Sequence, residues 1–181
     1  CIGNNVGTLL SGNSPGAVAF GSDSFAITRI NPAAPFNQEV HAVTVCPRIF
    51  PPHAGAGPGI LNLPQFITFG SVGGKQIFGV TNSAVGDNSV TFLQANSPAT
   101  IFAKVFVGGI PSNIVFGSNR FGVTVSSTNS FVIIDGFTFG ELANLSVGTN
   151  PQKAEFGNNL FCVTNRGSNT VTFIDSKSLN V

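Results

Sequence analysis

One phrase recurs four times along the chain and limits what the chain can fold into. Each copy begins with a proline, has a Phe-Gly pair at a fixed offset after it, and continues into a Phe-x-Val/Ile-Thr segment. The prolines that lead the four copies are Pro15, Pro64, Pro111 and Pro151. Repetition at a period of roughly 40–50 residues is typical of repeat proteins, in which each unit packs on its sequence neighbours.

The composition of each unit predicts strands rather than helices. Short runs of Val, Ile, Thr and Phe alternate with Gly, Asn, Ser and Pro, which is the pattern of strands joined by tight turns. In the third unit the strands are expected over 111–117, 121–125 and 129–135, with a weaker fourth over 143–150. This pattern predicts an all-β chain that forms a β-propeller of four-stranded antiparallel blades.

The fourth unit carries the most specific sequence. The segment Phe161–Asn165, which reads FCVTN, followed by Ser168–Asp175, resembles the YVTN-type β-propeller repeat. That repeat has an aromatic-Val-Thr-Asn strand, a Gly-Ser-Asn turn and a third strand that ends in Ile-Asp. The segment Phe78–Asn82 matches almost as well, whereas Val125 and Arg29 stand where the repeat has asparagine. The resemblance implies a propeller over most of residues 6–181, with phenylalanine replacing the family's tyrosine in every copy.

Four units predict about four blades in a single propeller domain over residues 1–181. Residues 6–13 precede the first proline, where a fourth strand is expected, and residues 151–175 supply the first three strands of the last unit. The segment 6–13 would then complete the last blade and close a four-bladed ring, which removes exposed sheet edges. The alternative is part of a larger propeller, because residues 176–181 begin a fourth strand of their own.

Charged residues are scarce, which narrows the expected partners. They make up 8% of the chain, and the net charge is +1, whereas charged residues make up roughly 25% of a typical domain. Such a balance argues against nucleic acid as a partner. No apolar run reaches the ~18–20 residues of a transmembrane segment. Low charge and abundant Asn, Ser, Thr and Gly favour an extracellular or cell-envelope location.

The three cysteines allow two hypotheses about processing. Cys1 is either the lipid-bearing first residue of a bacterial lipoprotein, and so a lipid anchor, or simply the residue at which the sequence begins. Cys46 and Cys162 belong to the first and last units, which are neighbours in a closed ring. A disulfide between them and two buried free thiols are both consistent with the sequence.

Titratable side chains offer little chemistry. His41 and His53 have no third ligand nearby in the sequence, so a metal site is not predicted. Asp135 and Asp175 end equivalent strands, and recurrence at equivalent positions predicts a turn-capping role. Reactive motifs such as Gly-x-Ser-x-Gly, Cys-x-x-Cys and His-Glu-x-x-His do not occur. The sequence therefore predicts no catalytic residue, no metal and no cofactor.

Glu155 is the exception to the regular pattern. The equivalent positions in the other units hold Ala19, Thr68 and Val115. If the first strands line the central channel, Glu155 and Thr68 face it. The other interpretation is a solvated pair between Glu155 and Lys153 on the same strand face.

Two irregular stretches predict where a partner binds. Residues 31–64 contain a Pro/Gly-rich loop with His53, and the second unit has a hairpin insertion at Lys75 and a long turn with Asp87. Loops on a rigid scaffold usually carry binding. The predicted function is a non-catalytic, extracellular or cell-surface structural module that binds a protein or self-associates. The alternative, which the resemblance implies, is a lactonase-like hydrolase or a domain of a periplasmic redox enzyme.

Overall fold

The computed structural model describes residues 15–21, 24–29, 39–44, 55–56, 63–95 and 100–181. These residues form antiparallel sheets, each with its strands paired in chain order. The first sheet contains β1 (Pro15–Phe20), β2 (Ser24–Arg29), β3 (Glu39–Thr44) and β4 (Gly55–Ala56). The second contains β5 (Pro64–Val72), β6 (Lys75–Asn82), β7 (Ser89–Gln94) and β8 (Ile101–Phe106). The third contains β9 (Pro111–Gly117), β10 (Arg120–Val125), β11 (Ser130–Asp135) and β12 (Glu141–Ser146). The fourth contains β13 (Pro151–Gly157), β14 (Leu160–Asn165) and β15 (Thr170–Asp175).

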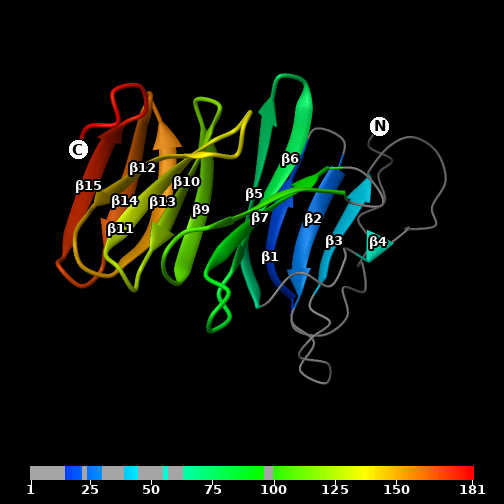
Figure 1. The fold of residues 1–181 in the computed structure, drawn as a ribbon, viewed down its shortest axis with the longest axis horizontal. Helices are drawn as coiled ribbons and strands as arrows, with labels where there is room; N and C mark the ends of the chain where they lie inside the picture. The colour runs from blue at the N-terminus through cyan, green and yellow to red at the C-terminus, as the bar shows by residue number, and fades with distance from the viewer. Residues whose placement is uncertain (1–14, 22–23, 30–38, 45–54, 57–62, 96–99) are drawn as a thin grey trace, which may run out of the picture.

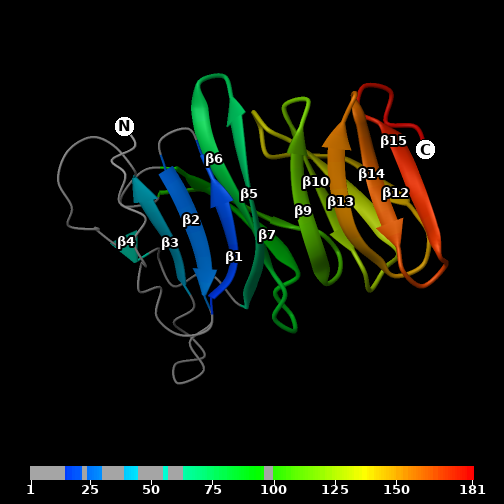
Figure 2. The ribbon, with the colours of Figure 1, turned by 180° about the vertical axis from the view of Figure 1, so that it is seen from behind.

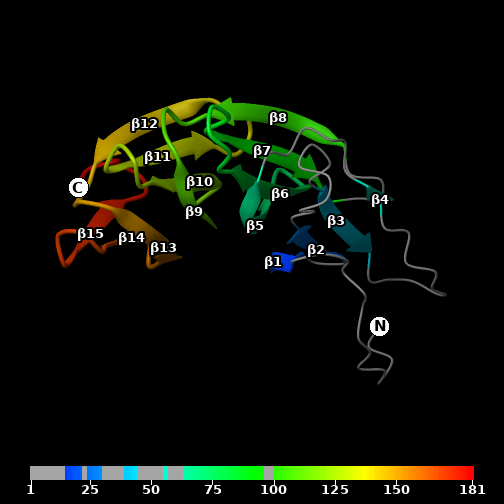
Figure 3. The same ribbon diagram turned by 90° about the horizontal axis from the view of Figure 1, so that it is seen from below.

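The four sheets are the blades of a β-propeller, as the repeats predict. The proline-led strands β1, β5, β9 and β13 lie next to one another in that order, so each repeat is one blade (Figure 1). The last strands β8 and β12 lie on the outer rim, as Figure 3 shows. We number the blades one to four in chain order.

The blades follow one another along an open arc. Blade one and blade four lie at opposite ends of it, with blades two and three between them (Figures 2 and 3). In the described residues the fourth blade has three strands, and residues 6–13, the expected closing strand, lie outside them. The described residues form an open arc, so both alternatives left by the sequence, a ring closed by residues 6–13 and part of a larger propeller, stay predictions.

The end of the fourth blade differs from the expected strand over 176–181. Residues 176–178 form a turn, and Leu179 has a positive φ of 60°. The same geometry recurs in blade three, where Phe139 has a φ of 59° immediately before β12 begins. The segment is therefore the equivalent of the turn between β11 and β12 in blade three, and the Asp175 side chain accepts hydrogen bonds from the backbone N–H groups of Lys177 and Ser178 within it.

The threonine of the Phe-x-Val/Ile-Thr motif stabilises an irregularity next to each leading proline. The pairing between the first and second strands shifts register there in every blade, which leaves backbone groups without ladder partners. The threonine Oγ1 accepts a hydrogen bond from one of the freed backbone N–H groups in three blades. The pairs are Ala17 N to Thr28 (2.9 Å), Phe66 N to Thr81 (3.0 Å) and Lys153 N to Thr164 (3.3 Å). The motif threonine is thus a structural residue.

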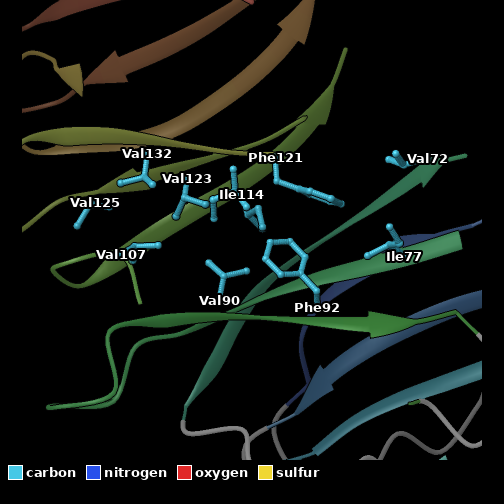
Figure 4. Packing of buried hydrophobic residues seen from close by; sticks show 11 residues of the cluster. Val72, Ile77, Val90, Phe92, Val107, Ile114, Phe121, Val123, Val125 and Val132 are labelled. Carbon is cyan, nitrogen blue, oxygen red and sulfur yellow. The ribbon is translucent and has the colours of Figure 1, made fainter. Parts of the chain in front are cut away.

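Phenylalanine rings fill the space between consecutive blades. Figure 4 shows the rings of Phe92 and Phe121 pointing toward one another between blades two and three, with centroids 4.8 Å apart. Phe131 and Phe161 meet in the same way between blades three and four, at 5.4 Å. All four rings are fully buried. Burial of large aromatic side chains dominates the energetics of a core, so these contacts hold the blades together.

A second phenylalanine explains the Phe-Gly pair of each repeat. The ring of Phe116 lies on Gly70 of the preceding blade, where a Cβ atom would come within 2.5 Å of its Cδ2. The ring of Phe156 lies on Gly117 in the same way, in the place that a Cβ would occupy. The glycine is required because a phenylalanine from the next blade covers its backbone. Around Gly157, no atom of the described residues lies within 4 Å of the Cβ position.

Candidate functional site

The asparagine of the motif is buried and serves the fold. Asn82 Nδ2 donates to Ser89 Oγ (3.0 Å) and Thr91 Oγ1 (2.9 Å), and Asn165 makes the same two bonds in blade four. In blade three, Val125 replaces this asparagine, and Val132 stands on the neighbouring strand where blades two and four have threonine. The donor and its acceptor are thus lost together, which leaves no buried polar group unpaired at this place.

Asp135 and Asp175 cap equivalent turns, which confirms the prediction made from their recurrence. Asp135 Oδ1 accepts hydrogen bonds from Phe137 N (2.9 Å), Thr138 N (2.8 Å) and Thr138 Oγ1 (3.1 Å). Asp175 Oδ1 accepts the same three bonds from Lys177 and Ser178. The pKa of each carboxyl lies below its usual value. The main cause is the hydrogen bond that the backbone N–H of Thr138 donates to Asp135, and that of Ser178 donates to Asp175.

These caps predict how stability depends on pH. A carboxyl whose pKa is lower in the folded state stabilises the protein above the unfolded pKa, and this contribution disappears as the pH falls through the folded pKa. We therefore expect the urea midpoint of the wild-type chain to drop between pH 5 and pH 3, and to drop less in an Asp135→Asn, Asp175→Asn double variant. Asn keeps the Oδ1 acceptor but does not titrate. Equal pH dependence in the two proteins would contradict this role.

A buried ion pair supports the long turn of blade two. Asp87 is 7% exposed, and its Oδ2 lies 2.9 Å from Lys104 Nζ of β8. Its Oδ1 accepts a hydrogen bond from Ser89, which in turn accepts one from Asn82. Asp87, which was predicted to bind a partner, therefore lies beneath the turn and not on its surface. Its ion pair with Lys104 joins the turn to β8, the outermost strand of the blade.

Large apolar side chains are exposed around this turn. Val85 at the turn is 99% exposed, Phe106 at the end of β8 is 66% exposed, and Ile110 in the following loop is 42% exposed. Val107 N donates to Asn88 O (2.9 Å), so the loop after β8 is tied to the turn. We call Val85, Phe106 and Ile110 the blade-two end. Exposed apolar side chains gathered on a rigid support mark interaction surfaces more often than scattered ones do.

The other predicted partner residues do not join the blade-two end. Lys75 begins β6, at the opposite end of the blade from Asp87, and its Nζ lies 5.7 Å from the Phe102 ring centroid. His53 and Cys46 lie outside the described residues, so a role for His53 and a disulfide between Cys46 and Cys162 stay predictions. Cys162 is half-buried on β14.

Glu155 and Thr68 lie on equivalent sheet faces. Ile67 packs toward blade one and Ala154 toward blade three, so the alternating neighbours Thr68 and Glu155 point toward the following blade. Thr68 is half-buried there, whereas Glu155 is exposed because the described residues place no fifth blade beside it. Because the described residues form an arc, the channel-facing role of both side chains stays a prediction.

Metal ligands and membrane spans were searched for among the described residues. Within these ranges, no group of three or more His, Cys, Asp or Glu is placed to hold a metal ion. The same part of the chain contains no helix that is long and apolar enough to cross a membrane.

The surfaces that sequence reasoning missed are apolar. These residues are exposed, whereas residues at equivalent positions of other repeats are buried. The sequence does not show this difference, because it depends on which blade lies beside each residue.

The comparisons with known proteins support the fold. No protein family model matches the chain, and no curated protein matches it, so membership of the YVTN-type family stays a prediction. Apo AztD from Citrobacter koseri resembles it with a TM-score of 0.70 at 13% identity, over 92% of this chain and 45% of that one. The chain therefore spans less than half of that protein.

Two further structures are similar. A chain of the nidogen/laminin complex has a TM-score of 0.61 at 13% identity, over 92% of this chain and 61% of that one. The computationally designed protein Ika4 has a TM-score of 0.64 at 11% identity, over 95% of this chain and 98% of that one. At such identities the likeness shows the fold alone, and that fold is the β-propeller.

Proposed function

We propose that the chain is a non-catalytic module of an extracellular or cell-surface β-propeller of the YVTN type, and that it binds a protein partner through the blade-two end. The observation that carries the proposal is the exposure of Val85 on the turn, of Phe106 at the end of β8 and of Ile110 in the following loop, where the Asp87–Lys104 ion pair joins the turn to β8. A surface on an ordered turn and loop binds at a lower entropy cost, since the loop need not be ordered on binding.

The use of the polar repeat residues supports a structural role. The motif threonines, asparagines and aspartates make hydrogen bonds within their own blade. Their recurrence therefore reflects the repeated fold and not repeated chemistry. The low charge of the chain, 8% of its residues, supports an extracellular or envelope location.

A capture experiment with a matched control tests the proposal. Proteins of the extracellular fraction that bind the immobilised chain would be identified, produced separately and titrated against wild type, Phe106→Ser and Phe137→Ser. Phe137 is 55% exposed and lies in the β11–β12 turn, at the opposite end of its blade. We expect Phe106→Ser to weaken binding by at least about 10-fold and Phe137→Ser to leave it unchanged. A saturable partner that responds equally to both variants, or no saturable partner, would overturn the proposal.

The second candidate is an enzyme of the lactonase-like or periplasmic redox type. One solved structure that resembles the chain, Kuenenia stuttgartiensis hydrazine synthase, is an enzyme, and it matches at 12% identity with a TM-score of 0.62. Such a function would need ligands that converge from several blades. Metal analysis of the purified chain separates the two candidates, because a stoichiometric bound ion would favour the enzyme.

A further inference from the structure

A glycosylation acceptor sequence lies on the outermost strand of blade three. The pattern Asn-x-Ser/Thr, with any residue except proline in the middle, occurs once in the chain, at Asn144-Leu145-Ser146. These residues form the end of β12. In the described residues β12 pairs with β11 alone and is the edge strand of its blade, on the outer rim of the arc (Figure 3). Such a short pattern also arises by chance, so the surroundings of Asn144 determine whether it can carry a sugar.

The strand presents both polar residues of the pattern to solvent. Successive side chains of a strand point to opposite faces, so Asn144 and Ser146 lie on one face and Leu145 on the other. Asn144 and Ser146 are exposed, whereas Leu145 is half-buried and packs on the core between blades three and four. Because Leu145 anchors the strand, a group attached to Asn144 extends into solvent without displacing the core.

The Asn144 side chain is not used by the fold. Within the described part of the chain it makes no hydrogen bond. Other asparagines of blade three do, since Asn113 Oδ1 accepts a bond from Ala154 N (3.0 Å) and Asn129 Oδ1 accepts one from Asn150 N (2.8 Å). A sugar on the Nδ2 of Asn144 therefore breaks no hydrogen bond among the described residues.

Blade two shows what the fold does with the same position. By the strand registers, Lys104 of β8 is the equivalent of Asn144. Lys104 is tied to the preceding turn, because its Nζ lies 2.9 Å from Asp87 Oδ2. The corresponding turn of blade three, between β10 and β11, contains no carboxylate. The position that holds a structural ion pair in blade two is thus free for modification in blade three.

We propose that Asn144 carries an N-linked oligosaccharide. The inference rests on the extracellular location in the proposed function, since the sugar is transferred during export. The co-reactant is an oligosaccharide joined through its anomeric carbon to a polyprenyl diphosphate. A bond forms between Asn144 Nδ2 and the anomeric carbon, and the bond from that carbon to the diphosphate oxygen breaks. Nδ2 loses one proton, the lipid diphosphate leaves with the bonding electrons, and nothing is oxidised or reduced.

The oligosaccharide also meets a need of the outer edge. An exposed edge strand pairs with other chains unless it is charged or covered. β12 has one charged residue, Glu141 at its start, and Leu142 beside it is 43% exposed. With 8% charged residues, the chain has little electrostatic repulsion to keep copies apart. A bulky, hydrophilic group at Asn144 covers this edge and adds solubility.

Peptide mapping of the protein from its natural source tests the proposal. Trypsin cleaves after Arg120 and Lys153, so one peptide, 121–153, contains Asn144. We expect this peptide to carry sugar, and to have aspartate at position 144 after peptide-N-glycosidase, which converts a glycosylated asparagine to aspartate. A parallel digest without the enzyme controls for spontaneous deamidation. A peptide 121–153 without sugar would overturn the proposal.

Variants of the 181-residue chain, secreted from cells that glycosylate exported proteins, give a second test. We expect intact mass to show one oligosaccharide on wild type and none on Asn144→Gln or Ser146→Ala. Ser146→Thr is the matched control, because it keeps the hydroxyl, and it should retain the sugar. All three changes lie at exposed positions, so the variants should fold, which circular dichroism checks. A secreted wild type without sugar, or a Ser146→Ala variant that keeps it, would contradict the assignment.

The two proposals can fail separately. Binding at the blade-two end is read from Phe106→Ser, and Asn144→Gln should bind the same partner as wild type does. Loss of the sugar with unchanged binding would therefore support both assignments. An unglycosylated protein that still responds to Phe106→Ser would overturn only the modification site.

Discussion

Replacing Phe121 by alanine is expected to lower the free energy of unfolding by about 4 kcal/mol. The side chain is fully buried between blades two and three, and its ring centroid lies 4.8 Å from those of both Phe92 and Phe116. Truncation leaves a cavity where two blades meet and removes two aromatic contacts.

Urea unfolding followed by far-ultraviolet circular dichroism measures this effect, since the chain has no tryptophan or tyrosine to report by fluorescence. The control is Phe137→Ala, because Phe137 is 55% exposed. We expect that variant to change stability by no more than about 0.5 kcal/mol. Similar losses in the two variants would mean that Phe121 does not lie in the core between the blades.

The second large effect is expected at Gly117. Alanine at this position should lower the free energy of unfolding by about 3 kcal/mol, because its Cβ would occupy the place of the Phe156 ring. The ring must move, and blade four then loses part of its contact with blade three. Neither Gly117 nor Gly157 has a positive φ, so backbone strain does not contribute.

Gly157→Ala is the matched control, because Gly157 occupies the same repeat position in blade four. No described atom lies within 4 Å of its Cβ position, so the monomer should change by no more than about 0.5 kcal/mol. The comparison uses chemical denaturation at a protein concentration low enough to keep the chain monomeric. Equal losses at the two glycines would show that Phe156 does not determine the need for glycine.

The blade architecture could be predicted from the sequence because each repeat carries the same residue types at corresponding positions. A proline and a Phe-Gly pair return at a fixed offset, and a threonine follows later in each unit. The threonine accepts a hydrogen bond beside the register shift in three blades, and a phenylalanine of the next blade lies on Gly70 and on Gly117. The turn-capping role of Asp135 and Asp175 was predictable for the same reason. The strand expected over 176–181 was wrong, because the sequence does not show where the capped turn ends and the following strand begins.

The candidate surfaces could be predicted only in part. The long turn with Asp87 was identified as a partner loop, but its carboxylate is buried by Lys104 of the outermost strand. That pairing joins the turn before β7 to β8, between two residues that lie 17 positions apart in the sequence. The exposure of Phe173 was not predicted, since the sequence does not distinguish it from its buried equivalent Phe92. Exposure depends on which blade stands beside the residue.

A double-mutant cycle between Gly117 and Phe156 tests most directly whether consecutive blades are joined by a phenylalanine on a glycine. The free energies of unfolding of wild type, Gly117→Ala, Phe156→Ala and the double variant would be measured under one set of conditions. We predict that Gly117→Ala costs about 3 kcal/mol in the wild-type background and no more than about 0.5 kcal/mol once Phe156 is alanine. Equal costs in both backgrounds would contradict the contact and the blade packing derived from it.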